Sequence, residues 1–372
     1  MTENILQFDT VALEFVNPEN DGENKESKKP ALKIIDQTKL PGKVEFLILR
    51  ELEEIRQAIY LLKVRGAPAI GVAAAIGIYV VSSDFVTHNM NEFETAFETA
   101  RQKLASARPT AVNLFWALGR MAKVVQNNRG KTVEAVKDLL REEAQKIRDE
   151  DVDACKKIGE YGLTLIKDGD GILTHCNAGQ LAAVRYGTAL APVHLARERG
   201  YNVKVYTAET RPLLQGSRLS AFELFSAGID TIVICDNMAS QVMKRGWVQA
   251  VFAGCDRMAA NGDACNKIGT SAVAILAKHY GIPFYICLPF STVDMNIKTG
   301  DDIPIEERDP GEVTEMWYKE PMAPAGVKVY NPAFDVTDNK LIRAVITERG
   351  IIRPPYDENL KKLNIPHLAA DL

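Results

Sequence analysis

The sequence lacks the short motifs that mark the commonest metal, redox and nucleotide sites. No two cysteines form a C-x-x-C pair, which argues against a zinc ribbon or a thioredoxin-type site. Neither G-x-G-x-x-G nor G-x-x-x-x-G-K-[ST] occurs, so the phosphate fingerprints of NAD-linked oxidoreductases and of P-loop proteins are missing. H-E-x-x-H and carboxylates at metal spacing are absent as well. Chemistry of these classes is therefore unsupported.

A strong charge of one sign and a long apolar run are also absent. The net charge of −4 gives no reason to expect a nucleic acid or an acidic membrane surface as partner. The longest apolar stretch, Ala67–Val81, is too short to span a bilayer and predicts a tightly packed internal helix. Met1–Thr10 shows no basic, apolar leader. Several cysteines lie in apolar runs, which favours reduced thiols and a cytoplasmic location: Cys155, Cys176, Cys235, Cys255, Cys265 and Cys287.

The pattern of the sequence changes near its middle. Helical spacing dominates the first part, as in the amphipathic stretch Phe93–Ala107. After Asp168, helical segments alternate with short apolar runs: Gly171–His175, Asn202–Tyr206, Thr231–Cys235, Ala250–Gly254 and Pro283–Leu288. Such alternation predicts a parallel sheet covered on both faces. We expect a helix-rich α+β domain at residues 1–148 and a larger α/β domain at residues 149–372, divided within a long charged helical stretch.

Two reactive side chains follow two of the apolar runs. Cys176 ends the run that begins at Gly171 and leads into Asn177-Ala178-Gly179, whereas Asp256 opens a polar loop that extends to Gly269. Ligands bind at the carboxyl ends of strands in open α/β sheets, where a thiol and a carboxyl group can move protons on a small substrate. The plainer interpretations are a packed small residue for Cys176 and a turn-forming aspartate for Asp256.

Local environment bears on the chemistry of both groups. A helix expected over Gln180–Arg199 would bring free N–H groups and a partial positive charge near Cys176, which lowers a thiol pKa and binds phosphate. An apolar pocket would raise the pKa of Asp256 and make it an acid at neutral pH. Because neighbouring residues on a strand point to opposite faces, we do not expect His175 to share a pocket with Cys176.

Basic residues stand beside small residues at several places. Arg65 precedes Gly66-Ala67-Pro68, Arg108 and Arg211 each precede a proline, and Lys267 lies in the polar loop that Asp256 opens. A fork-shaped guanidinium group suits phosphate, although any single arginine is more often a partner in a surface salt bridge. Because several basic residues stand beside small residues, the sequence favours a pocket that binds a small anion.

Several longer motifs occur along the chain: Arg65–Gly71, Arg108–Leu114, Thr174–Gly179, Glu209–Gly216, Asp236–Ala239, Asp256–Gly269, Ile303–Arg308 and Asn331–Thr337. In these motifs, and in their order, the chain resembles the 5-methylthioribose-1-phosphate isomerase family, the aldose–ketose isomerases of methionine salvage. The resemblance covers nearly the whole chain from about residue 30. Many long motifs in one order make it specific.

The resemblance implies a small N-terminal domain and a Rossmann-like C-terminal domain, usually in a homodimer, with no metal or organic cofactor. The family's catalytic cysteine falls on Cys176 and its catalytic aspartate on Asp256. Its substrate-binding positions fall on Arg65, Gly66, Ala67, Arg108, Gln215, Asn266 and Lys267. Three residues depart from the usual pattern and leave the preferred group at C5 of the sugar open: Gln180, Ala208 and Cys255.

The implied reaction converts 5-methylthioribose 1-phosphate to 5-methylthioribulose 1-phosphate. Phosphate on C1 keeps the furanose closed, so Asp256 is expected to protonate the ring oxygen. Cys176 is expected to serve the transfer of hydrogen from C2 to C1, either as a thiolate base or in support of a hydride shift. Isomerases of 5-deoxyribose 1-phosphate or ribose 1,5-bisphosphate remain alternatives. The non-enzymatic alternative is a regulatory subunit of the translation-initiation exchange complex, a related binding module that is not expected to keep the whole catalytic set.

Overall fold

The computed structural model describes residues 8–17, 28–109 and 111–364, which form two compact units. The first unit contains the described residues up to Asp153 and also the short segment Gln180–Arg185. The second contains Ala154–Gly179 and the described residues from Tyr186 onward. Helix α5 (Val133–Leu163) continues from the first unit into the second. The division predicted near residue 148 also falls inside α5, but the sequence did not predict the return of Gln180–Arg185 to the first unit.

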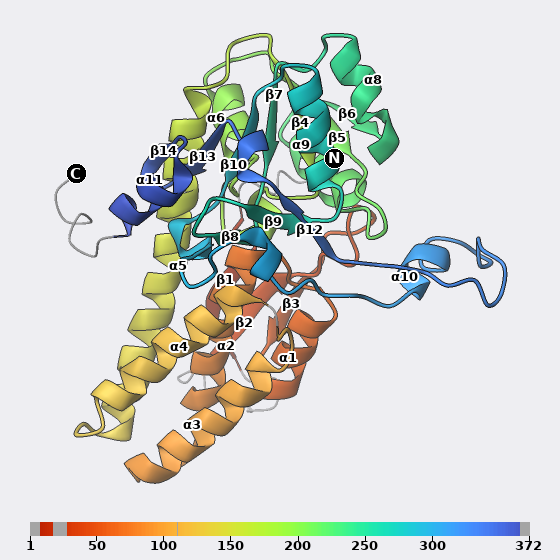
Figure 1. The fold of residues 1–372 in the computed structure, drawn as a ribbon. Coiled ribbons are helices and arrows are strands. Elements are labelled where there is room, and N and C mark those ends of the chain that lie inside the picture. Colours follow the sequence, from red (N-terminus) through yellow and green to blue (C-terminus); the bar gives the residue numbers. More distant parts are fainter. Residues whose placement is uncertain (1–7, 18–27, 110, 365–372) are drawn as a thin grey trace. The chain divides into compact units, whose positions relative to one another are not determined.

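The first unit combines a small sheet with helices. Its antiparallel strands have the order β1-β2-β3 and span Val11–Val16, Lys29–Ile35 and Phe46–Leu49. Its other helices are α1 (Leu52–Tyr60), α2 (Ala67–Ser83), α3 (Met90–Ala105) and α4 (Val112–Asn127), drawn from red to yellow in Figure 1. Helix α2 is buried along almost its whole length and forms the centre of the core, which confirms the predicted internal helix.

The second unit is built on a seven-stranded sheet of order β14-β13-β10-β7-β4-β5-β6. Its strands are β4 (Gly171–His175), β5 (Lys204–Ala208), β6 (Asp230–Ile234), β7 (Ala250–Ala253), β10 (Phe284–Cys287), β13 (Ala344–Thr347) and β14 (Gly350–Ile352). All pairings are parallel except that of β14 with β13. Along the chain, β5 and β6 are first added on one side of β4, and β7, β10 and β13 are then added on its other side. This reversal is that of a Rossmann-like sheet and confirms the predicted α/β class.

Helices cover both faces of this sheet. One face packs against the end of α5, α6 (Ala191–Glu198) and α7 (Ala221–Ser226). The other packs against α8 (Ala239–Lys244), α9 (Thr270–His279) and α11 (Tyr356–Leu363). This two-sided burial explains why the strands read as continuous apolar runs in the sequence.

A smaller sheet follows β7 in the same unit. Its order is β11-β8-β9-β12, with strands at Val293–Asp294, Arg257–Ala259, Ala264–Lys267 and Phe334–Thr337. The stretch from Asp256 to Gly269, predicted as a polar loop, therefore contains the antiparallel strands β8 and β9. The short helix α10 (Gly311–Thr314) lies in an excursion between β11 and β12. Among the described residues, no helix combines the length and apolarity needed to cross a bilayer.

Candidate active site at the reversal of strand order

Cys176 and Asp256 follow the two strands between which the order of the sheet reverses. Strands β4 and β7 pair in parallel, with His175 opposite Ala253, so the segments that continue from them leave the same edge of the sheet. The space outside such a reversal is where ligands bind in open α/β sheets. The structure therefore places the two predicted catalytic residues on adjacent segments at a favourable position for a small-molecule site.

The segments that leave β4 and β7 contact each other directly. A Cβ atom on Gly254 would lie 2.6 Å from the Cβ of Ala178, so only glycine permits this approach. Gly254 stands two residues before Asp256, and Ala178 two residues after Cys176. The absence of a side chain at Gly254 thus brings the two reactive segments together.

Cys176 is held in an unusual backbone conformation. Its φ of 64° is left-handed, which is rare for a residue with a side chain, and the residue is almost entirely buried. Its N–H donates to Thr210 Oγ1 at 2.8 Å, and its carbonyl accepts from Ser220 Oγ at 2.7 Å. Both main-chain groups of Cys176 are therefore fixed by hydroxyl groups.

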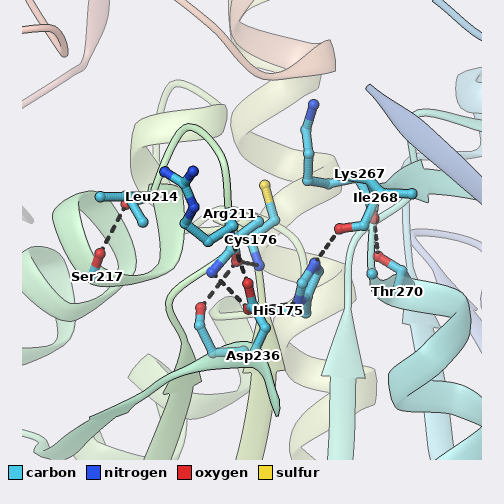
Figure 2. A network of polar contacts seen from close by, with 12 residues as sticks. His175, Cys176, Arg211, Leu214, Ser217, Asp236, Lys267, Ile268 and Thr270 are labelled. Carbon is cyan, nitrogen blue, oxygen red and sulfur yellow. Dashed lines mark hydrogen bonds and ion pairs between the residues drawn. The ribbon is translucent and has the colours of Figure 1, made fainter. Parts of the chain in front are cut away.

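Thr210 is itself fixed by a carboxylate. Asp236 accepts hydrogen bonds from the N–H groups of Thr210, at 2.8 Å, and Arg211, at 2.7 Å. Figure 2 shows this network beneath Cys176, whose side chain extends to the opposite side from Asp236, as does that of Lys267. The thiol therefore points away from the hydrogen bonds that fix the backbone of Cys176.

His175 performs a structural task on the other side. It is fully buried, and its Nε2 lies 2.8 Å from the carbonyl oxygen of Ile268. Burial lowers the pKa of His175, although nearby Asp236 opposes this shift. A neutral imidazole with its proton on Nε2 donates to that carbonyl and ties the end of β4 to the segment after β9. A Cβ on Gly269 would lie 2.8 Å from His175 Cε1, so this contact also requires glycine.

Asp256 is half-buried between β7 and β8. Its N–H donates to the carbonyl of Cys265 at 2.9 Å. Burial raises the pKa of the Cys265 thiol to about 12 and raises the pKa of the Cys255 thiol well above its ordinary value. The negative charge of Asp256 adds to both shifts. Asp256 therefore opens the β8–β9 hairpin directly beside two buried thiols.

Asn266 and Lys267 belong to β9, which pairs with β8 just beyond Asp256. Asn266 is buried and donates through Nδ2 to Thr270 Oγ1 at 3.0 Å. Lys267 is partly exposed, with Nζ 4.4 Å from the centre of the Phe334 ring. The structure therefore places both predicted substrate-binding residues on the hairpin that Asp256 opens.

Gln215 follows β5 and is 4% exposed. Its Oε1 is buried and has no hydrogen-bond partner among the residues that the structure describes. A buried oxygen left without a donor costs about 1–3 kcal/mol, which a hydroxyl group of a ligand would recover. This observation supports substrate binding at Gln215.

The remaining predicted residues lie in the first unit. Arg65, Gly66 and Ala67 stand at the start of α2, and Arg108 precedes α4. A Cβ on Gly71 would lie 3.1 Å from the carbonyl oxygen of Asn113, so the first turns of these two helices pack against each other. Two arginines therefore stand by neighbouring helix N-termini, an arrangement that suits phosphate.

One prediction about Cys176 is wrong. The helix expected over Gln180–Arg199 begins only at Ala191, because Tyr186 and Gly187 have left-handed φ values of 64° and 77° that interrupt it. Only a short 3₁₀ turn, Gln180–Ala182, follows the cysteine. No helix dipole therefore acts on Cys176 from this segment.

Sequence reasoning assigned no role to the residues that fix the backbone of Cys176. Thr210 and Asp236 were part of the motifs that carried the resemblance, but they had no assigned role. Glu223 was not considered, although an acidic residue between Phe222 and Leu224 in an apolar helix is itself a signal. In the part of the chain that the structure describes, no cluster of three or more His, Cys, Asp or Glu residues could hold a metal ion.

Residues 63–354 match the model of the Initiation factor 2 subunit family. Among the similar proteins, methylthioribose-1-phosphate isomerase of Symbiobacterium thermophilum is 60% identical over 90% of this chain and 93% of its own length. The 5-deoxyribose 1-phosphate isomerase of Petrotoga mobilis is 56% identical over 90% of this chain and 96% of its own.

Two solved structures are also similar to this chain over nearly its whole length. The crystal structure of 5-methylthioribose 1-phosphate isomerase from Pyrococcus horikoshii has a TM-score of 0.85 and 43% identity, and the alignment covers 95% of each chain. The structure described as translation initiation factor eIF-2B, subunit delta, from A. fulgidus has a TM-score of 0.83 and 43% identity, over 96% of this chain and 99% of the other.

Proposed function

The chain belongs to the Initiation factor 2 subunit family, and we propose that it is an aldose–ketose isomerase that converts 5-methylthioribose 1-phosphate to 5-methylthioribulose 1-phosphate in methionine salvage. The observation that carries the proposal is the position of Cys176 and Asp256, which follow adjacent strands where the order of the sheet reverses. The two isomerase names among the relatives support the reaction class.

In the proposed reaction, Asp256 donates a proton to the ring oxygen as the bond from that oxygen to C1 breaks. The hydrogen on C2 then moves to C1, and the C2 hydroxyl becomes the ketone as it loses its proton. Cys176 either takes the C2 proton as a thiolate and returns it to C1, or stabilises a direct hydride shift. Its nearly complete burial keeps water from the opened intermediate.

We assign substrate binding to the residues that the sequence singled out. In the second unit, Gln215 offers a carbonyl oxygen that no described residue binds, and Asn266 and Lys267 stand on the hairpin after Asp256. In the first unit, Arg65, Gly66, Ala67 and Arg108 stand at the packed first turns of α2 and α4, and we assign them to phosphate.

The experiment that tests this function follows each sugar 1-phosphate by proton NMR with the purified protein. Turnover of 5-methylthioribose 1-phosphate that disappears in the folded variants Cys176→Ser and Asp256→Asn is the expected result. Near wild-type turnover in either variant refutes the catalytic assignment. Substrate deuterated at C2 separates the two routes, because a proton exchanges with solvent whereas a hydride is retained.

The second candidate function is the isomerisation of 5-deoxyribose 1-phosphate, which relatives at 53–56% identity are named for. The two substrates differ only in the group at C5. The ratio of kcat/KM for the two in the same NMR assay decides between them.

We further propose that the protein is a cytoplasmic homodimer. None of the six cysteines, all of which lie in the described part of the chain, forms a disulfide, which supports a reducing compartment. The edge strand β6 exposes the apolar residues Ile232 and Val233, and Phe225 before it is 69% exposed. An apolar edge strand is a surface that a second copy can cover.

A further inference from the structure

A buried carboxyl group lies behind the segment that carries Cys176. Glu223 of α7 has no exposed surface, and its Oε2 accepts a hydrogen bond from Asn177 Nδ2 at 3.0 Å. His194 of α6, also buried, places Nε2 3.3 Å from the other carboxylate oxygen. Burying a carboxyl group without hydrogen-bond partners costs free energy, so the contacts with Asn177 and His194 stabilise Glu223 in its buried position.

The same carboxyl group determines which residue can stand at position 179. A Cβ atom on Gly179 would lie 1.6 Å from Glu223 Oε1, a separation that no side chain tolerates. Glu223 thus contacts the Cys176 segment twice, by a hydrogen bond at Asn177 and by close packing at Gly179.

A second path leads from Glu223 to the cysteine itself. Asn177 Nδ2 also donates to Ser220 Oγ at 3.1 Å, and Ser220 Oγ donates to the carbonyl oxygen of Cys176 at 2.7 Å. The network therefore runs from Glu223 through Asn177 and Ser220 to the backbone of Cys176. Coupled networks of this kind rigidify the groups they join.

We propose that Glu223 is a positioning residue for the reaction, which holds the Cys176 segment through Asn177 and Gly179 so that the thiol keeps its direction. The inference rests on the proposed role of Cys176 in the isomerase reaction. The proposed role is indirect, because it acts through the hydrogen bond to Asn177 and the packing at Gly179 and assigns Glu223 no contact with the reacting atoms. Its contribution is to kcat rather than to substrate affinity.

The test is the Glu223→Gln variant, which keeps the shape of the side chain but replaces one of its two acceptor oxygens with a donor NH2 group. We expect kcat to fall about 10- to 100-fold with KM within about twofold, the size of effect that small misplacements of reacting groups cause. The rate at which iodoacetamide alkylates Cys176, measured by peptide mass spectrometry, should change at least about threefold, as the same displacement of the thiol requires.

Glu312→Gln is the matched control. Glu312 is also a buried carboxyl group of the second unit, and it accepts hydrogen bonds from Arg308 and Asn331. We expect this variant to lose stability without a specific loss of kcat. The double variant Glu223→Gln with Asn177→Asp exchanges donor and acceptor at constant net charge and should recover part of the lost kcat. Absence of recovery overturns the route through Asn177.

Two outcomes overturn the proposal as a whole: kcat within twofold of wild type in Glu223→Gln, or losses of kcat and of Tm that match those of Glu312→Gln. If Glu223→Gln does not fold, Ser220→Ala tests the same network and should lower kcat about 3- to 10-fold, as the loss of one hydrogen bond implies. The alkylation rate reports on Cys176 without turnover, so a failure of this inference is distinguishable from a failure of the proposed reaction.

Discussion

The N–H of Cys176 donates to Oγ1 of Thr210 across 2.8 Å, and both residues have left-handed backbone conformations, with φ values of 64° and 66°. Thr210 Oγ1 in turn donates to the carbonyl of Ala208 at 2.9 Å. One hydroxyl group thus joins the ends of the neighbouring strands β4 and β5. The conformation of Cys176 depends on contacts between strands rather than on its own propensity.

Replacing Thr210 with valine keeps the shape of the side chain and removes the hydroxyl group. The buried N–H of Cys176 then has no acceptor there, which costs about 1–3 kcal/mol of unfolding free energy. We expect urea denaturation to show this loss and the NMR assay to show a lower kcat. Thr210→Ser keeps the hydroxyl group and should stay near wild type in both; equal behaviour of the two variants would contradict the role of the hydrogen bond.

Arg108→Ala should mainly raise KM. If its guanidinium group binds the phosphate, removal of a charge-assisted hydrogen bond raises KM about 10- to 100-fold and leaves kcat within about threefold. Steady-state kinetics with the sugar 1-phosphate measure both constants. Arg101→Ala, which removes an arginine paired with Glu98 on α3, is the control and should change neither. An unchanged KM in Arg108→Ala removes Arg108 from the phosphate site.

Gly269 and Gly281 precede and follow α9, and both have left-handed φ values, of 98° and 70°. A Cβ on Gly281 meets open space, whereas one on Gly269 meets the His175 ring. Gly281→Ala should cost about 1–2 kcal/mol for the backbone alone. Gly269→Ala should cost at least about 1 kcal/mol more because of the steric overlap. Chemical denaturation of both variants measures the difference, and equal costs would argue against the His175 contact.

Asp151 of α5 predicts a pH dependence of stability. It accepts the N–H of Val184 at 2.8 Å, and burial raises its pKa from 3.8 to about 7. Because the folded state binds this proton more tightly than the unfolded chain, stability is greatest below the lower pKa and declines as the pH rises between the two values. Asp151→Asn removes this titration.

We therefore expect the Tm of Asp151→Asn to fall less than that of wild type between pH 5 and pH 8, as measured by calorimetry. The control, Asp153→Asn, changes an exposed carboxyl group on the same helix and should keep the wild-type profile. A wild-type profile in Asp151→Asn would show that Asp151 is not the group responsible.

Val233→Lys tests the proposed homodimer. A lysine on the exposed face of β6 sets a charge in any interface that this edge strand forms, so sedimentation velocity should show a shift toward monomer. Val86→Lys, at a fully exposed position of the first unit, is the control and should leave the sedimentation coefficient unchanged. A dimeric Val233→Lys would place the contact elsewhere.

The sequence predicted those parts of the site that depend on local pattern. Strand β4 has the predicted bounds, and β7 ends one residue before the predicted end, because continuous apolar runs that stop at small and polar residues are a strong signal. The reversal of strand order between them is a property of the whole sheet and was not predicted. The hairpin β8–β9 was missed because its strands are short and rich in polar residues. Glu223 was missed because its partners come from other parts of the chain.

The segment Gln180–Arg185 has a consequence for how the chain can be divided. It belongs to the first unit, where Gln37 Nε2 donates to the carbonyl of Leu181 at 2.7 Å and Thr10 N–H donates to that of Val184 at 3.2 Å. A nascent chain therefore cannot complete its first unit until residue 185 has left the ribosome, by which time β4 and Cys176 have already emerged. A fragment that ends at the middle of α5 would lack these contacts and would therefore not contain the whole first unit.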